Sequence, residues 1–150
     1  MSEPRIFRCQ HRVTYAECTV GNHIYHSRYL DILEAARGEF MRAAGQCLLT
    51  LQDSGAIFPV IEARLKYHRP ARYDDVLTIE LRLIQLAGVR LGVQHRVLLA
   101  DGRLVLEAET RHVCTNLEDK PRRLPATLVE GLRPWLDLRY VERPGRPPAD

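Results

Sequence analysis

The chain has 150 residues, of which 45% are hydrophobic and 27% charged, and its formal net charge is +3. This length suits one domain with a substantial core. The small, dispersed charge argues against nucleic acid as a partner, because nucleic-acid binders concentrate basic residues on one face. No segment is long and apolar enough to cross a bilayer, and no apolar signal region is visible. Four cysteines without paired spacing favour reduced thiols and a cytoplasmic location.

Periodicity at the start of the chain predicts a strand followed by a long helix. The strand spans residues 5–18, and a short connection covers residues 19–23. Apolar residues at steps of three and four then predict a helix from about residue 27 to 44, with Ser27 as N-cap and Gly45 as its stop. The apolar stripe of this helix consists of Tyr29, Leu33, Ala36, Phe40 and Ala44.

Alternating apolar residues predict four further strands, over residues 61–67, 77–83, 89–99 and 104–108. Asp101-Gly102 forms a hairpin turn in this prediction, and a short helix is expected around residues 128–136. Neighbouring strands after one long helix favour an α+β fold, in which an antiparallel five-stranded sheet packs on that helix. We expect a single domain over residues 1–136 and a Pro-rich C-terminal tail over residues 137–150.

Three ordered blocks carry a recognisable pattern. Residues 12–37 contain Tyr25-His26, Tyr29-Leu30 and Glu34-Ala-Ala-Arg37, residues 67–79 begin Tyr-His-Arg-Pro-Ala, and residues 120–125 are Lys-Pro-Arg-Arg-Leu-Pro. In type and spacing these blocks resemble the 4-hydroxybenzoyl-CoA thioesterase-like branch of the hotdog superfamily. The resemblance implies a sheet wrapped around one long central helix and active sites at a dimer interface. It also implies an acyl-CoA or acyl-carrier-protein thioester as substrate.

The sequence departs from that family at one position of its catalytic motif. The family's second acidic residue after the first strand is the catalytic aspartate. Aligning on Tyr15 and Tyr25 places Glu17 at the first acidic position and Thr19 at the second. Threonine supplies no carboxylate, so the standard mechanism does not transfer. A thioesterase with this sequence is expected to use Glu34 or Glu17 instead.

Thioester hydrolysis needs donors for the carbonyl oxygen and a group that attacks or activates water. Unpaired N–H groups are expected at the helix start around His26 and Ser27. Glu34, two turns into the helix, is the first candidate for base or nucleophile, and the alternative is an ion pair with Arg37. Glu17 is the second candidate, unless it is a solvated or hydrogen-bonded acid at a strand end. Arg37 matches a helical arginine on which some polyketide-pathway hotdog thioesterases rely.

Four polar residues of the loop, Thr19, Asn22, His23 and His26, could position water or donate to the carbonyl, or could simply bond to the loop backbone. His23 and His26 lack further ligands, so no metal is predicted, and no cofactor is expected apart from the CoA of the substrate. His95 and Cys18 are expected in the core. Five basic residues resemble positions near the family's nucleotide groove and are candidates for the CoA phosphates: Arg69, Arg72, Lys120, Arg122 and Arg123.

The leading hypothesis is acyl-CoA hydrolysis by a homodimer or homotetramer without a membrane span. One alternative is a hotdog dehydratase or hydratase, which needs a histidine and an acid facing each other across the dimer. The other is a non-catalytic protein that binds acyl-CoA or acyl carrier protein, and Thr19 is the feature that favours it.

Overall fold

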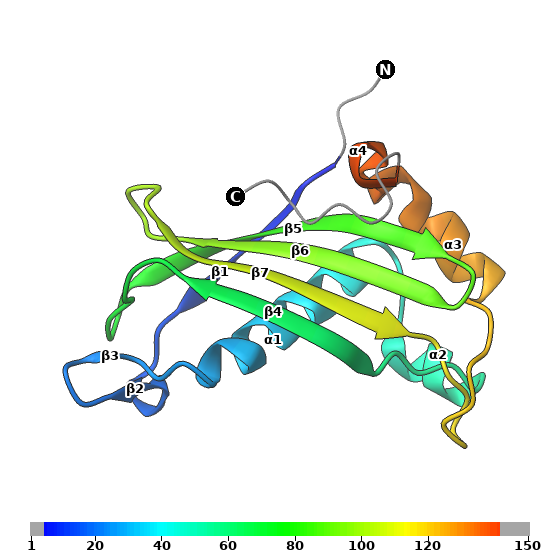
Figure 1. Ribbon diagram of the computed structural model, residues 1–150, viewed down its shortest axis with the longest axis horizontal. Coiled ribbons are helices and arrows are strands. Elements are labelled where there is room, and N and C mark those ends of the chain that lie inside the picture. Colours follow the sequence, from blue (N-terminus) through cyan, green and yellow to red (C-terminus); the bar gives the residue numbers. More distant parts are fainter. Residues whose placement is uncertain (1–4, 142–150) are drawn as a thin grey trace.

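The computed structural model describes residues 5–141 and shows a curved antiparallel sheet that packs on one long helix (Figure 1). The sheet has five strands in the order β1-β5-β6-β7-β4. Their bounds are β1 Phe7–Arg12, β4 Val60–Tyr67, β5 Val76–Ala87, β6 Arg90–Leu98 and β7 Leu104–Val113. The helix is α1, Arg28–Ala43. The α+β architecture predicted from the sequence is confirmed.

Helix α1 begins and ends where the sequence predicts. Ser27 occupies the N-cap position, but its backbone is helical and its side chain makes no capping hydrogen bond. Gly45 follows the helix with φ +77°, a conformation that favours glycine. Four residues of the predicted stripe, Tyr29, Leu33, Ala36 and Phe40, are buried, whereas Ala44 is only partly buried. This stripe holds the helix on the inner face of the sheet.

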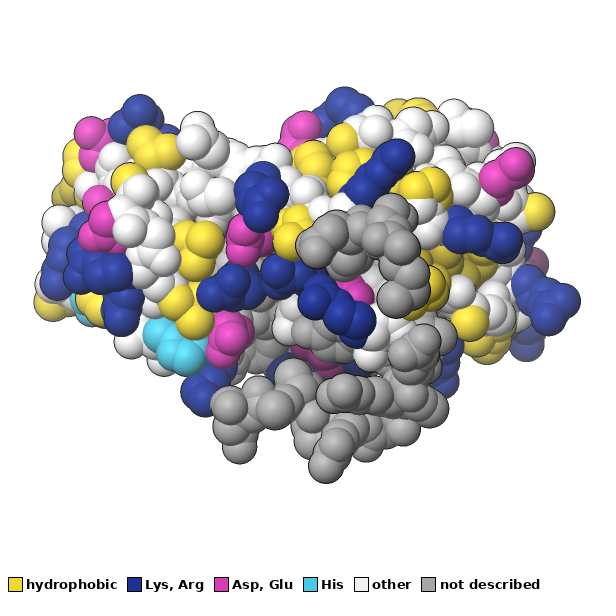
Figure 2. All heavy atoms as spheres, turned by 90° about the horizontal axis from the view of Figure 1, so that it is seen from above, with side chains coloured by type: hydrophobic (Ala, Val, Ile, Leu, Met, Phe, Trp, Pro, Cys, Tyr) yellow, Lys and Arg dark blue, Asp and Glu magenta, His cyan; other side chains and the backbone are white. Residues whose placement is uncertain are grey.

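The two faces of the sheet differ in chemistry, as expected for an antiparallel sheet covered on one side. On β5, Leu77, Ile79 and Leu81 are buried on the inner face. On the opposite face, Glu80 pairs with Arg8 at 2.9 Å and with Arg96 at 3.4 Å. In the view of Figure 2, basic and acidic side chains are interspersed rather than gathered into one basic patch.

Strand β4 lies at one edge of the sheet and pairs only with β7. Seven of its eight residues are exposed, and they include the large apolar residues Val60, Ile61 and Tyr67. The pairing with β7 is irregular between Val60 and Glu62. One edge of this strand, which exposes apolar and charged residues together, is therefore left without a partner within the described chain.

The predicted first strand is too long. It ends at Arg12, and a 3-10 helix η1 (Tyr15–Glu17) and the two short strands β2 (Cys18–Thr19) and β3 (His23–Ile24) follow. The chain turns because the Val13 N–H donates to the Asp75 carbonyl at 2.9 Å and Thr14 caps η1. Helix α2 (Leu48–Asp53) was not predicted, because six residues are too few to show a helical period.

The C-terminal segment forms α3 (Ala126–Leu132), the 3-10 helix η2 (Arg133–Trp135) and α4 (Leu138–Val141). The chain remains folded past residue 136, since Asp137 is buried and its N–H donates to the Leu83 carbonyl at 2.8 Å. Residues 142–150 of the predicted tail lie outside the described residues. None of the helices within residues 5–141 has the length and apolarity needed to span a membrane.

Candidate functional site

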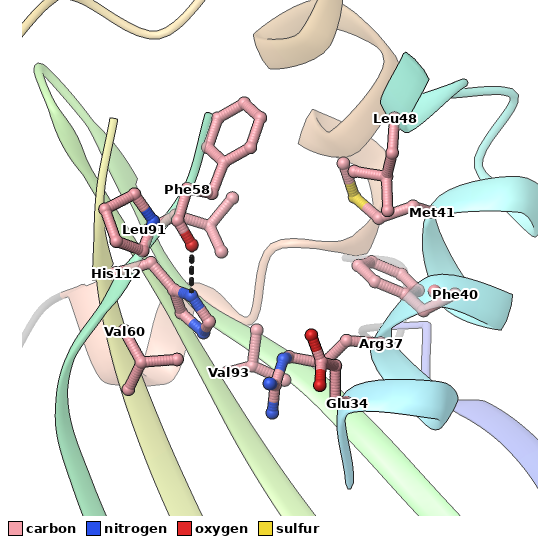
Figure 3. A pocket seen from close by; sticks show the side chains of 12 residues that line it. Glu34, Arg37, Phe40, Met41, Leu48, Phe58, Val60, Leu91, Val93 and His112 are labelled. Carbon is pink, nitrogen blue, oxygen red and sulfur yellow. Dashed lines mark hydrogen bonds between the residues drawn. The ribbon is translucent and has the colours of Figure 1, made fainter. Parts of the chain in front are cut away.

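A cavity of about 240 Å³ lies between α1 and the inner face of the sheet, beside the start of β4 (Figure 3). Its apolar lining comes from α1, α2, β6 and the segment that enters β4: Phe40, Met41, Leu48, Phe58, Pro59, Val60, Leu91 and Val93. Three polar side chains also line it: Glu34, Arg37 and His112. A mostly apolar cavity with a few convergent polar groups is the usual form of a small-molecule site.

Arg37 is half-buried at this cavity, and its side chain makes no hydrogen bond or ion pair within residues 5–141. Glu34 lies beside it on α1 (Figure 3), yet the helix ion pair considered as the alternative is not formed. Burial lowers the pKa of Arg37 and the Glu34 carboxylate opposes this change, and a guanidinium stays charged in proteins. Within residues 5–141 the cavity therefore holds a cation that has a carboxylate nearby but makes no hydrogen bond or ion pair.

Two histidines lie under α1 on the inner face of the sheet. His112 is buried, and its ring nitrogens lie 3.1 Å from the Phe58 carbonyl and 2.9 Å from Thr110 Oγ1. Burial, and then the charge of Arg37, lower its pKa, although the Phe58 hydrogen bond opposes them. His95 is fully buried as predicted, and burial and Arg37 lower its pKa to about 3. Neither of its ring nitrogens makes a well-formed hydrogen bond within residues 5–141.

The predicted catalytic residues fall into two groups. Glu34 and Arg37 line the cavity, whereas Thr19, Asn22, His23, His26 and Ser27 lie in or next to the β2–β3 loop at the start of α1. Ten residues of helix separate Ser27 from Arg37, which is about 15 Å along the axis. One protomer therefore does not bring the two groups together around a single carbonyl carbon.

The loop group is engaged mainly in holding the loop. Thr19 pairs with His23 across the β2–β3 hairpin. The Asn22 side chain accepts from the Tyr73 N–H at 3.3 Å, and the His26 carbonyl accepts from the Tyr67 hydroxyl at 3.0 Å. Thr19 and the His26 and Ser27 side chains are exposed.

Glu17 is the last residue of η1 rather than part of an extended strand, so it does not share a strand face with Thr19. Its Oε1 accepts from the Thr14 N–H at 2.8 Å and lies 2.8 Å from His11 Nε2. Burial opposes the effect, but these hydrogen bonds hold the pKa of Glu17 below its usual value. A carboxylate so engaged is a weak general base.

The five predicted phosphate-binding residues lie at opposite ends of the sheet (Figure 1). The Arg69 N–H bonds near the start of β7, at Val105, whereas the Arg122 N–H bonds beyond its end, at Cys114. The ten residues of β7 span roughly 30 Å. Arg69 and Arg72 line a second groove of about 450 Å³, while Lys120, Arg122 and Arg123 follow β7.

His112 was missed at the level of sequence because the predicted last strand ended at residue 108, five residues short of its real end. Continuing the alternation of Leu106 and Ala108 would have placed Thr110 and His112 on the inner face. Within the described residues no three His, Cys, Asp or Glu side chains are grouped so as to hold a metal ion.

An antiparallel sheet of this strand order around one long helix defines the hotdog class of proteins. The chain belongs to the thioesterase-like superfamily, whose family model matches residues 13–136. The resemblance to hotdog thioesterases is thereby confirmed, as is the assignment to the thioester hydrolases.

Similar proteins cover nearly the whole chain. It is 34% identical over 125 residues to the acyl-CoA thioester hydrolase YbgC of Escherichia coli, covering 83% of this chain and 93% of that protein. Among solved structures, the hypothetical protein TT1821 from Thermus thermophilus is 32% identical with a TM-score of 0.79, covering 84% and 96% of the two chains. A probable thioesterase from Bartonella henselae is 33% identical with a TM-score of 0.75, covering 81% and 100%.

The hydrogen-bonded carboxylate of Glu17 predicts a pH-dependent contribution to stability. Replacement by Gln keeps an oxygen that can accept from the Thr14 N–H but removes the charge that strengthens this bond and the contact with His11. It is expected to destabilise the fold at pH 7 by ~1 kcal/mol. Because the folded pKa is below the ordinary value of 4.5, the difference between parent and Glu17→Gln should be constant above that value. It should vanish as pH falls through the folded pKa. Urea unfolding from pH 3 to 7 measures this, with the exposed Glu39→Gln as control. A difference that grows on acidification contradicts the assignment.

Proposed function

We propose that this protein hydrolyses acyl-CoA thioesters, with the acyl group in the cavity beneath α1 and the thioester carbonyl at Arg37. The observation that carries the proposal is a half-buried guanidinium without a partner, next to a carboxylate, at an apolar cavity. Arg37 supplies two or more N–H donors to the oxygen on which negative charge develops, in a setting of low dielectric.

Glu34 is the working carboxylate in this proposal. It accepts a proton from a water molecule as the water oxygen bonds to the carbonyl carbon. The tetrahedral intermediate then collapses, the carbon–sulfur bond breaks, and the proton passes to the departing thiolate. Glu34 suits this task because no hydrogen bond or ion pair engages its carboxylate within the described chain, whereas Glu17 is held by Thr14 and His11. Thr19, at the position of the family's aspartate, then needs no acidic role.

The cavity favours an apolar acyl group larger than one benzene ring. A dry cavity of about 150 Å³ accommodates benzene, and this cavity measures about 240 Å³. Scaling by volume gives room for about ten carbon atoms. The aromatic and aliphatic lining from Phe40 to Leu91 suits either a medium alkyl chain or a substituted aryl group.

Substitutions at the two helix residues test the mechanism. Arg37→Met is expected to lower kcat by about 10²- to 10³-fold, the range found for a lost oxyanion donor, and Glu34→Gln by a similar factor. Hydrolysis of octanoyl-CoA and benzoyl-CoA, followed by thiol release, measures both. Glu39→Gln, on an exposed part of the same helix, is the matched control.

Two outcomes would overturn this mechanism. Full activity in Glu34→Gln with loss in Glu17→Gln would move the base to η1. CoA binding by the parent without hydrolysis of any thioester would instead support a non-catalytic acyl-CoA-binding protein.

The open edge of β4 supports assembly of two copies. Natural proteins normally cover or pair an edge strand that exposes large apolar residues. Strand β4 exposes Val60, Ile61 and Tyr67 among charged residues, and Val60 also lines the cavity. We therefore infer a homodimer in which β4 strands meet. The partner then covers the mouth of the cavity, and two such dimers can form a tetramer.

A charge placed on this edge is expected to separate the copies. Ile61→Lys should reduce the sedimenting mass to that of one chain at micromolar concentration and lower kcat/KM at least about tenfold, since a desolvated charge opposes the apolar contact. Leu117→Lys, at a more exposed apolar residue away from β4, serves as control. A parent protein that sediments as a single chain contradicts the dimer.

Arg69 is our candidate for the CoA phosphates. In its groove, Arg103 is already paired with Asp101 at 2.7 Å, and Arg72 donates to the Gly21 carbonyl at 3.0 Å. The Arg69 side chain has no such partner within the described chain. The groups at the two ends of the sheet are too far apart to hold one phosphate within a protomer.

Arg69→Ala should therefore raise KM for an acyl-CoA about ten- to a hundredfold, as for one lost charged hydrogen bond, with little change in kcat. The matching acyl-pantetheine, which lacks the phosphates, should show no change in KM. Steady-state kinetics at low salt measure both, with Arg133→Ala as control. A KM that responds to Arg123→Ala but not to Arg69→Ala would assign the phosphates to the other end of the sheet.

A further inference from the structure

His112 occupies an unusual position, because a polar ring stands in the apolar wall of the cavity with both nitrogens engaged. Only 4% of the residue is exposed, and Thr110, its partner, is 1% exposed. Figure 3 shows the ring between the Phe58 carbonyl and the guanidinium of Arg37. Neither the proposed mechanism nor the motifs of the sequence use this residue.

The two hydrogen bonds fix the tautomer of the ring. A carbonyl oxygen only accepts, so Nδ1 must carry the hydrogen that reaches Phe58 at 3.1 Å. In the neutral ring Nε2 is then an acceptor, and the Thr110 hydroxyl donates to it at 2.9 Å. A protonated ring would reverse the second bond, with Nε2–H donating to the Thr110 hydroxyl oxygen, and would place a second cation opposite Arg37. Burial and the charge of Arg37 both lower the pKa of His112 and so act against protonation.

The Phe58 carbonyl belongs to the segment that forms one wall of the cavity. Ile57 forms an isolated bridge with Thr115, and Val60 begins the edge strand opposite His112. Pro59, between them, has no N–H to give to a ladder, although its carbonyl accepts from the Val113 N–H at 3.2 Å. The wall therefore lies just before the irregular start of β4, and the side chain of His112 ties it to β7.

We propose that His112, in its Nδ1–H form, is a positioning residue that holds the Phe58–Pro59 wall at a fixed distance from α1 and thereby sets which acyl groups fit. The part of this inference that concerns acyl groups rests on the proposed function. The position of the wall rests on the hydrogen bonds of His112 alone. His112 does not touch the reacting atoms, and it acts through the Phe58 backbone.

Replacing His112 by asparagine or by glutamine distinguishes this positioning role from general packing. The amide nitrogen of Asn overlies Nδ1 and can still donate to Phe58, whereas that of Gln reaches the Nε2 position beside Thr110. His112→Asn should keep the ratio of kcat/KM between octanoyl-CoA and acetyl-CoA within about threefold of the parent. His112→Gln and His112→Leu should lower this ratio about ten- to a hundredfold, the range of a lost buried hydrogen bond, through KM more than kcat. Thr110→Val, which leaves the Phe58 bond intact, should lie between the parent and His112→Gln.

A second readout does not depend on hydrolysis. Hydrogen exchange of the Val113 amide, which bonds to the wall at Pro59, should speed up at least about tenfold in His112→Gln and remain slow in His112→Asn. Equal exchange and equal chain-length ratios in the two variants would overturn the inference. If the parent hydrolysed no thioester, the proposed function would fail, while the exchange rates would still decide the role of His112.

Discussion

Helix α1 and the inner face of the sheet bury each other, and the positions of the site residues follow from that contact. A helix has 3.6 residues per turn, so the stripe from Tyr29 to Phe40 faces the sheet. Residues directly beside this stripe lie at the margin of the contact between helix and sheet. Glu34 and Arg37 occupy that margin on the side of β4. At this margin Arg37 is half-buried and Glu34 is exposed, and the cavity lies beside both side chains.

The same contact explains why Arg37 is available to a ligand. Its neighbours beneath the helix are histidines rather than carboxylates, and both are held neutral by burial and by Arg37 itself. A carboxylate in place of either ring would pair with the guanidinium and occupy its donors. The unpaired charge lowers the stability of the free protein. The negative charge that develops on the carbonyl oxygen offsets that loss. The interaction of Arg37 with this oxygen is therefore stronger in the transition state than in the ground state.

Periodic sequence patterns were sufficient to predict the regular helices and strands of this molecule. Helix α1, four of the five strands as periodic segments, and the ordered motif blocks follow from regular spacing, and so does the position of Arg37 on the helix. The predictions that failed concern local, irregular structure. The first strand stops at Arg12 because Thr14 and Glu17 close a capping box, a choice that alternation does not reveal. Helix α2 is too short to show a period. The roles of Arg72 and His112 depend on partners 51 and 54 residues away, which no local pattern contains.

The irregular pairing between Val60 and Glu62 separates the cavity wall from the regularly paired part of β4. From Glu62 to Tyr67 the register with β7 is regular, and a shift by one residue there would turn every side chain to the opposite face. Before Glu62 the pairing with β7 is irregular, and Phe58 and Pro59 belong to no strand or helix, so an added or lost residue can be absorbed locally. Insertions, deletions or substitutions can therefore lengthen, shorten or reshape the Phe58–Pro59 wall without changing the strand pairing of the sheet. In relatives built this way, acyl preference can diverge while the architecture stays constant.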